Sequence, residues 1–340
     1  TFLIENYPQS DYLDDALYEK GRAYIQLDKG DQAIHVFEQL TTQFPQSQYA
    51  PKAGNEIALI HYQNNRINAA IKAYKMVIIN YSGSEQANVA MRDLKNLYVE
   101  ENMVDSYVDF ATQTKGMVTV DVNERDSLTY KAAELAYTRG EDKKAIDSFS
   151  KYLSQFNNGA YIIDAKYYLG CLYYKQNDYD QARYYLQQVA ERRNSKYCEE
   201  ATRMLGDLAY NNKDYNLAIE AYGNLINLTG NPTTKLHAQV HRLRSAWIIK
   251  DYELLVNESG QVLTNSKLAP ETATELRYYR AKSYLAQSKS ESAIEDLRIL
   301  AKDTRNVYGA EAKYQLAQIY YNIKQYDHAE KEVLDYINVS

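Results

Sequence analysis

The chain is poor in cysteine, and this excludes a fold held together by a disulfide framework. Only two cysteines occur among its 340 residues, Cys171 and Cys198. The surrounding pattern places both on helices, with helix positions that differ by about nine residues, or roughly 13 Å of rise. A disulfide bridge needs a much shorter separation, so we predict two free structural thiols.

The chain also lacks the short motifs that carry catalysis. It has no glycine-rich phosphate loop, no paired-cysteine motif, no His-Glu-x-x-His and no Gly-x-Ser-x-Gly. His237 and His241 could begin a zinc site with Glu275, but a solvated pair of histidines is the ordinary explanation of their spacing. We therefore predict a protein that is not an enzyme and that holds no cofactor and no metal.

Two further absences limit the partners. No apolar run approaches the length of a membrane span. The net charge is −6, and lysines and arginines alternate with acidic residues instead of forming a basic stripe. Because nucleic-acid binding needs a clustered basic face, we predict neither a nucleic-acid partner nor a membrane-spanning segment.

What the sequence does contain is a block that recurs nine times, every 36 to 39 residues. Each block has an anchor position that precedes an apolar, helix-like pattern. Ser106 and Leu255 fill it in two blocks, and alanine fills it in the other seven: Ala33, Ala70, Ala145, Ala182, Ala218, Ala293 and Ala329. A repeat of this period predicts stacked supersecondary units rather than one globular core.

Residues 14–45 show the pattern of one block most clearly. Gly21 lies in a first apolar stretch, and Ala33 and Phe37 lie in a second one beyond the polar turn at 28–31. Apolar spacings of three and four residues in each half indicate amphipathic helices. The block is therefore predicted to be a helical hairpin, in which small residues let two backbones approach and large residues fill the space beside them.

Blocks three and seven depart from this pattern. They have Leu94 and Leu243 where other blocks have Gly or Ala in the first helix, and Ser106 and Leu255 at the anchor. If these positions face each other, the hairpins must open or rotate to avoid overpacking. Either the repeat simply drifts here, or superhelical curvature changes near residues 120 and 266.

The recurring small, small and large residues resemble the tetratricopeptide repeat, and the resemblance covers essentially the whole chain. Joints between blocks, such as YPQSDY at 7–12 and FPQSQY at 44–49, are similar to those of a subfamily in bacterial envelope proteins. That subfamily includes the outer-membrane assembly lipoprotein and the Tol–Pal coordinator. The resemblance implies a periplasmic or outer-membrane-associated location in a Gram-negative bacterium, with a cytoplasmic location as the alternative.

We predict an all-α fold, a right-handed superhelical α-solenoid of about nine tetratricopeptide hairpins preceded by a partial N-terminal helix. Residues 1–10 would be the end of a truncated repeat. Repeats 1–3 would occupy residues 11–120, repeats 4–7 residues 121–265, and repeats 8–9 residues 266–340, in one continuous solenoid.

In the family that the chain resembles, first helices line the concave face and bind extended or helical peptides. One position on that face is mostly aromatic: Ile25, Tyr62, Tyr98, Tyr137, Tyr174, Tyr210, Trp247, Leu285 and Tyr321. Aromatic columns with charges between them suit peptide capture, although tyrosine is also common there for packing alone. The predicted partner-binding residues are Tyr137, Tyr167, Tyr174, Arg203, Asp207, Tyr210, Arg244, Trp247 and Tyr278.

The sequence thus favours a non-enzymatic scaffold that binds a partner protein or peptide along its concave face. Trp247, the single tryptophan, is the first candidate for a contact residue. The alternative is a structural or self-associating segment of a larger multi-repeat protein, joined through the ends of the array. A repeat domain fused to an enzyme that lies outside this chain is a third possibility.

Overall fold

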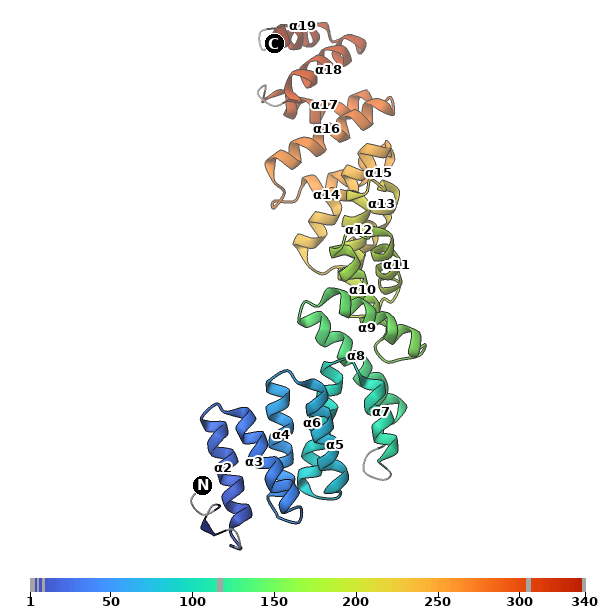
Figure 1. Cartoon of the computed structure of the whole chain (residues 1–340). Coiled ribbons are helices and arrows are strands. Elements are labelled where there is room, and N and C mark those ends of the chain that lie inside the picture. Colours follow the sequence, from blue (N-terminus) through green and yellow to red (C-terminus); the bar gives the residue numbers. More distant parts are fainter. Residues whose placement is uncertain (1–3, 5, 8–9, 115–118, 304–306, 338–340) are drawn as a thin grey trace. The chain divides into compact units, whose positions relative to one another are not determined.

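The computed structural model describes residues 4, 6–7, 10–114, 119–303 and 307–337, and its regular elements are all α-helices (Figure 1). The helices form hairpins, each with a first and a second helix. The pairs are α2 (Leu13–Gln26) with α3 (Gly30–Gln43), α4 (Ala50–Gln63) with α5 (Ile67–Asn80), α6 (Glu85–Glu100) with α7 (Val104–Gln113), α8 (Val122–Thr138) with α9 (Asp142–Gln155), α10 (Ile162–Lys175) with α11 (Tyr179–Ala190), α12 (Cys198–Asn211) with α13 (Tyr215–Leu228), α14 (Pro232–Ile249) with α15 (Tyr252–Leu263), α16 (Pro270–Ala286) with α17 (Ser290–Ala301), and α18 (Gly309–Asn322) with α19 (Tyr326–Ile337).

The predicted all-α array of helical hairpins is therefore confirmed. The truncated repeat predicted for residues 1–10 falls largely outside the described residues. Among the helices that are described, none combines the length and the apolar character needed to cross a bilayer.

Contacts within the chain divide it into two compact units, residues 1–165 and residues 166–340. The division falls within α10. The predicted repeat groups that end near residues 120 and 265 stay a prediction.

Every hairpin turns at one residue with a left-handed backbone. These residues are Asp28, Asn65, Asn102, Gly140, Asn177, Lys213, Lys250, Ser288 and Lys324. The N–H of the next residue reaches back to the first helix, as from Lys29 to the Tyr24 carbonyl at 2.9 Å and from Asp251 to the Ala246 carbonyl at 2.8 Å. This is a Schellman-type helix ending, which satisfies carbonyl groups that the helix itself leaves unpaired. The turn therefore fixes the register of the second helix.

The turn shows that the predicted anchor of the third hairpin is wrong by one residue. In the other hairpins the left-handed residue lies five positions before the anchor, which is Leu255 in the seventh hairpin and alanine in the rest. Asn102 therefore assigns the anchor of the third hairpin to Tyr107. Tyr107 is 1% exposed, and its N–H donates to the Met103 carbonyl at 3.2 Å, whereas Ser106 is exposed. The same shift replaces Tyr98 in the aromatic column by Val99. Small size favoured Ser106 in the sequence, but the turn geometry decides the register.

Close packing within a hairpin joins a small residue of the first helix to a large residue of the second. A Cβ atom at Gly206 would lie 2.7 Å from the Tyr222 ring, and one at Gly170 would lie 2.8 Å from Leu186. In the seventh hairpin the sizes are exchanged, because Leu243 takes the place of the glycine and buried Ser259 that of the large residue. The third hairpin has Ala111 at the position of the large residue, and the one-residue shift places partly exposed Lys95, not Leu94, at the position of the glycine.

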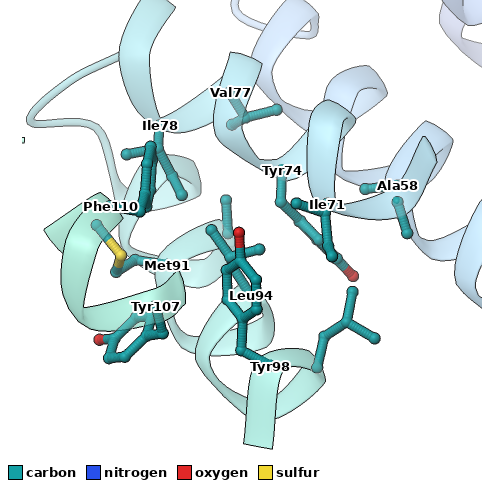
Figure 2. Close-up of a cluster of buried hydrophobic side chains, with 13 residues drawn as sticks. Ala58, Ile71, Tyr74, Val77, Ile78, Met91, Leu94, Tyr98, Tyr107 and Phe110 are labelled. Atoms are coloured by element: carbon teal, nitrogen blue, oxygen red, sulfur yellow. The ribbon is translucent and has the colours of Figure 1, made fainter. Parts of the chain in front are cut away.

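The exchange of large and small residues in the seventh hairpin conserves volume, which packed cores tolerate well. It corrects the expectation that Leu243 and Leu255 overpack their hairpin, since both are fully buried beside a serine. Overpacking therefore no longer supports the predicted change of curvature, which stays a prediction. Figure 2 shows the corresponding core of the third hairpin, where Leu94, Tyr98 and Tyr107 gather beside residues of α5.

Candidate functional site

All nine predicted partner-binding residues lie on first helices, and each is partly exposed. Tyr137 lies on α8 in the unit formed by residues 1–165, and we describe it separately from the others. Tyr167 and Tyr174 lie on α10, in the other unit. The remaining six lie on α12, α14 and α16: Arg203, Asp207, Tyr210, Arg244, Trp247 and Tyr278. We call the surface that these six residues form the first-helix face.

Trp247 lies at the centre of an aromatic group on this face. Its ring stacks on Tyr279, with centroids 4.6 Å apart and planes 11° apart. Tyr278 meets the same indole nearly edge-on at 6.1 Å, and Tyr252 lies 6.4 Å away. The hydroxyl group of Tyr279 donates to Glu275 at 2.8 Å, which fixes the ring below the indole. The indole is therefore held in place while part of its surface remains accessible.

The aromatic column also has a packing role inside each hairpin. Its members contact the first residue of the second helix, as in the pairs Tyr174–Tyr179 at 6.3 Å and Tyr210–Tyr215 at 5.8 Å between centroids. Edge-on aromatic pairs of this kind stabilise a structure beyond the area they bury. The aromatic side chains predicted to bind a partner are therefore also side chains that pack within the hairpins.

Tyr167 and Tyr278 are more fully engaged than the sequence predicted. Each stacks on a tyrosine from the joint that follows its hairpin, Tyr197 at 4.1 Å and Tyr308 at 4.3 Å. The joint tyrosine recurs in the sequence, and its first-helix partner lies 30 residues earlier in both cases. That spacing is a signal from which the stacking could have been found.

The charged residues of α12 form a hydrogen-bonded cluster. Arg203 donates to Glu200 at 2.7 and 3.0 Å and also contacts Asp207. Asp207 accepts a bond from the Tyr222 hydroxyl at 2.8 Å and lies 3.1 Å from Nε2 of His237. Burial alone would raise the pKa of Asp207, but the contacts with His237 and Tyr222 and the charge of Arg203 outweigh it and hold the pKa below its usual value.

Ion pairs connect successive first helices. Arg244 of α14 donates to Glu275 of α16 at 2.7 Å, and Lys282 of α16 donates to Glu311 of α18 at 2.9 Å. The Tyr278 hydroxyl also donates to Glu311, at 2.8 Å. Arg244 and Lys282, which lie between the aromatic residues of these first helices, are thus paired within the protein. The arrangement offers aromatic surface between fixed polar groups, which suits contact with side chains of another molecule.

The histidine pair has a structural role here. The rings of His237 and His241 lie 4.1 Å apart, and Nδ1 of His241 is 3.0 Å from the His237 carbonyl. Burial lowers the pKa of His241. Glu275, considered above as a third zinc ligand, is bound to Arg244 instead. Among the described residues, no group of three or more His, Cys, Asp or Glu side chains could hold a metal ion.

The sequence did not reveal Tyr279 and Glu311 as residues that shape the face. It also did not reveal that the ring of His241 packs against Tyr210, with centroids 5.0 Å apart. Opposite charges 31 and 29 residues apart, in Arg244–Glu275 and Lys282–Glu311, are the signal that could have revealed the ion pairs. Tyr279 gave no comparable signal, because it lies beside Tyr278 in a chain rich in tyrosine.

Comparison with solved structures gives weak overlaps. Similar chains include PilF of Pseudomonas aeruginosa, at 16% identity and a TM-score of 0.30, over 66% of this chain and 96% of that one. The C-terminal part of a TPR repeat-containing protein from Cytophaga hutchinsonii has 13% identity and a TM-score of 0.31, over 95% of each chain. The TPR domain of P58(IPK) has 14% identity and a TM-score of 0.27, over 95% of this chain and 92% of that one. No curated protein matches the chain.

The family is established by sequence. A family model described as tetratricopeptide repeat matches residues 18–85, 167–227 and 278–337, which together make up more than half of the chain. Repeats of this family generally mediate interactions between proteins and form a scaffold that is typically not catalytic. The chain belongs to the tetratricopeptide-repeat family.

Proposed function

We propose that the first-helix face binds a partner protein or peptide, and that Trp247 is its central contact residue. The observation that carries this proposal is the Trp247–Tyr279 stack, which holds the single tryptophan of the chain partly exposed between ion pairs. Aromatic side chains fixed in advance lose little entropy on binding, which is why tryptophan and tyrosine dominate binding hot spots. The neutralised ion pairs would select a partner by hydrogen bonding rather than by net charge.

A comparative pull-down tests this proposal. The baits are the native chain, a site variant with Tyr210→Ser and Trp247→Ser, and a control variant with Tyr12→Ser and Tyr184→Ser, two exposed tyrosines that do not belong to the face. Circular dichroism first establishes that all three are folded. We expect a protein that the native and control baits retain and the site variant loses. Equal retention by all three baits would contradict the proposal.

We also propose residence in the bacterial envelope, because the joint motifs resemble those of envelope proteins. The joint has a structural use as well. The N–H of Tyr49 donates to Oγ of Ser47 at 3.1 Å, and that hydroxyl donates to Asp14 at 2.6 Å. Fractionation of source cells, with detection of the native protein, tests the location. Recovery in the soluble cytoplasmic fraction would overturn it.

A second candidate function, association with another copy, rests on the face of α18 and α19. Val333 is 42% exposed, whereas the equivalent Phe37 and Tyr222 are completely buried by their own hairpin and the next. The hollow beside it has a volume of about 760 Å³ and is lined by Tyr314, Tyr321 and Leu334. Exposed apolar surface of this kind favours association.

Analytical ultracentrifugation over a range of protein concentrations tests this second candidate. We expect the mass to rise with concentration for the native chain and for Val122→Lys, a change at a valine that is 76% exposed elsewhere. Val333→Lys is expected to remain monomeric. A native chain that stays monomeric at every concentration would dismiss self-association and leave the first-helix proposal untouched.

A further inference from the structure

The second helices α11, α13 and α15 border two adjoining hollows that the function proposed above does not use. One hollow, of about 420 Å³, lies between α11 and α13, and buried Thr202 and Leu205 of α12 are part of its lining. The other, of about 500 Å³, lies between α13 and α15, and Gln239 and Arg242 of α14 are part of its lining. Both hollows share one exposed edge of α13, formed by Glu220, Asn224 and Asn227.

Five carboxamide side chains line these hollows, beside charged residues that include Glu191 and Arg193 in the first hollow. The carboxamides are Gln187 of α11, Asn224 and Asn227 of α13, Gln239 of α14 and Gln261 of α15. Within the part of the chain that the structure describes, none of these amide groups has a hydrogen-bond partner. Each carries both donors and acceptors, so it can pair with the N–H and C=O groups of another main chain.

Hydrogen bonds of Arg242 hold the base of the second hollow together. Arg242 donates to Glu258 at 2.9 and 3.0 Å and also donates to the carbonyl of Ile219. The guanidinium lies where a side chain at position 223 would be, and glycine at that position makes room for it. Because Glu258 neutralises Arg242, the second hollow keeps one uncompensated charge, the carboxylate of Glu220. Among the described residues, Glu220 has no ion-pair partner.

We propose that this second-helix face binds an extended polypeptide segment that carries a basic side chain. A helical ligand satisfies its own main-chain groups and could not use the carboxamides, whereas an extended one presents them at every residue. Crossing three second helices about 10 Å apart takes roughly six residues of extended chain. Glu220, at the edge shared by the two hollows, pairs with the basic side chain. The site lies apart from the first-helix face and does not depend on it.

Fluorescence anisotropy with short labelled peptides tests the proposal on the full chain. The probe is an unstructured peptide of repeated Gly-Ser-Lys units. One comparison peptide has Glu in place of Lys, and another has alternate main-chain nitrogens methylated. We expect the Lys peptide to bind, and both comparison peptides to bind at least about tenfold more weakly, because they lose the ion pair or the main-chain donors.

Variants of the protein locate the site. The double variant Asn224→Ala and Asn227→Ala should weaken binding of the Lys peptide by about tenfold, and Glu220→Gln should weaken it and reduce its dependence on salt. The matched control changes two exposed asparagines of α6, Asn88→Ala and Asn96→Ala, and should bind as the native chain does. Trp247→Ser should also bind normally. Equal binding of the native chain and the Asn224 and Asn227 variant, or of the methylated and unmethylated peptides, would overturn the proposal.

Discussion

Trp247 stacks face to face on Tyr279, its neighbour from the next first helix, with ring centroids 4.6 Å apart. The stack joins α14 to α16 at the same place as the ion pair between Arg244 and Glu275. Two contacts of different character therefore fix the same side of the tryptophan. This relationship makes the single tryptophan both the centre of the proposed site and a spectroscopic reporter of it.

Removal of the stacked ring should change the tryptophan signal. Tyr279→Ser exposes the covered face of Trp247 to water, and we expect its fluorescence emission to move to longer wavelength. The control Tyr184→Ser removes a tyrosine that is 58% exposed on α11 and should leave the emission unchanged. An unchanged spectrum in Tyr279→Ser would mean that the stack does not shield the indole.

Because small residues pack against large ones within a hairpin, replacing glycine by alanine should destabilise the protein at a packed position and not at an open one. At Gly170 the new Cβ would lie 2.8 Å from Leu186, and we expect Gly170→Ala to lower the free energy of unfolding by about 1–3 kcal/mol. At Gly230 no atom lies within 4 Å of the new Cβ, so Gly230→Ala should change stability little. Thermal unfolding followed by circular dichroism measures both. Equal melting temperatures for the two variants would contradict the packing described here.

The left-handed backbone at the hairpin turns predicts that a change to glycine there stabilises the protein. Lys250 has φ of 62°, a conformation that costs a residue with a Cβ roughly 1 kcal/mol and costs glycine little. We expect Lys250→Gly to raise the free energy of unfolding by about that amount. Lys72→Gly, in the exposed middle of α5, should lower it by about 1 kcal/mol. Shifts of the melting temperature in the same direction would argue against the assigned turn geometry.

Burial of His241 predicts a dependence of stability on pH. Its pKa is lowered from 6.5, so the unfolded chain takes up a proton that the folded chain does not as the pH falls below that value. Stability should therefore decrease as the pH falls from neutral, until the lower pKa of the folded state is reached. His61 contributes in the same sense, because burial lowers its pKa too. Asp207 acts in the same direction but at lower pH, because its pKa is also lowered and its stabilising contribution is lost only as the pH falls through the acid range.

The variant His241→Gln isolates this effect. We expect its melting temperature to fall less than that of the native chain between about pH 7.5 and about pH 5.5. His35→Gln changes an exposed histidine of α3 and should leave the slope as it is. If the melting temperature of His241→Gln changes with pH as much as that of the native chain does, another group causes the loss of stability.

The sequence was sufficient to predict the hairpins because their packing repeats along the chain. Ala33, Ala218 and the other anchor alanines are buried, as their spacing indicated. It failed at Tyr107, where the side chain at the anchor is large and only the left-handed Asn102 reveals the register. Turn conformation has a weak signature in sequence, since Asp, Asn, Lys and Ser all occupy it here.

The candidate site was predictable as a set of positions but not as a set of contacts. Trp247 and Tyr210 were found because they recur at one position of the first helix. Their partners Tyr279 and His241 were not, because stacking depends on how neighbouring first helices face each other. The charges of Arg244 and Asp207 were interpreted as available to a partner, whereas the structure pairs them with Glu275 and His237.

Site-specific cross-linking in the source cell tests whether the first-helix face binds a partner. A photo-reactive phenylalanine analogue replaces Tyr210 on the first-helix face in one variant and exposed Tyr184 in another, after thermal unfolding shows that both variants are folded. We expect a cross-linked partner from position 210 and none from position 184. Absence of any product from position 210, or the same product from both positions, would contradict the proposal.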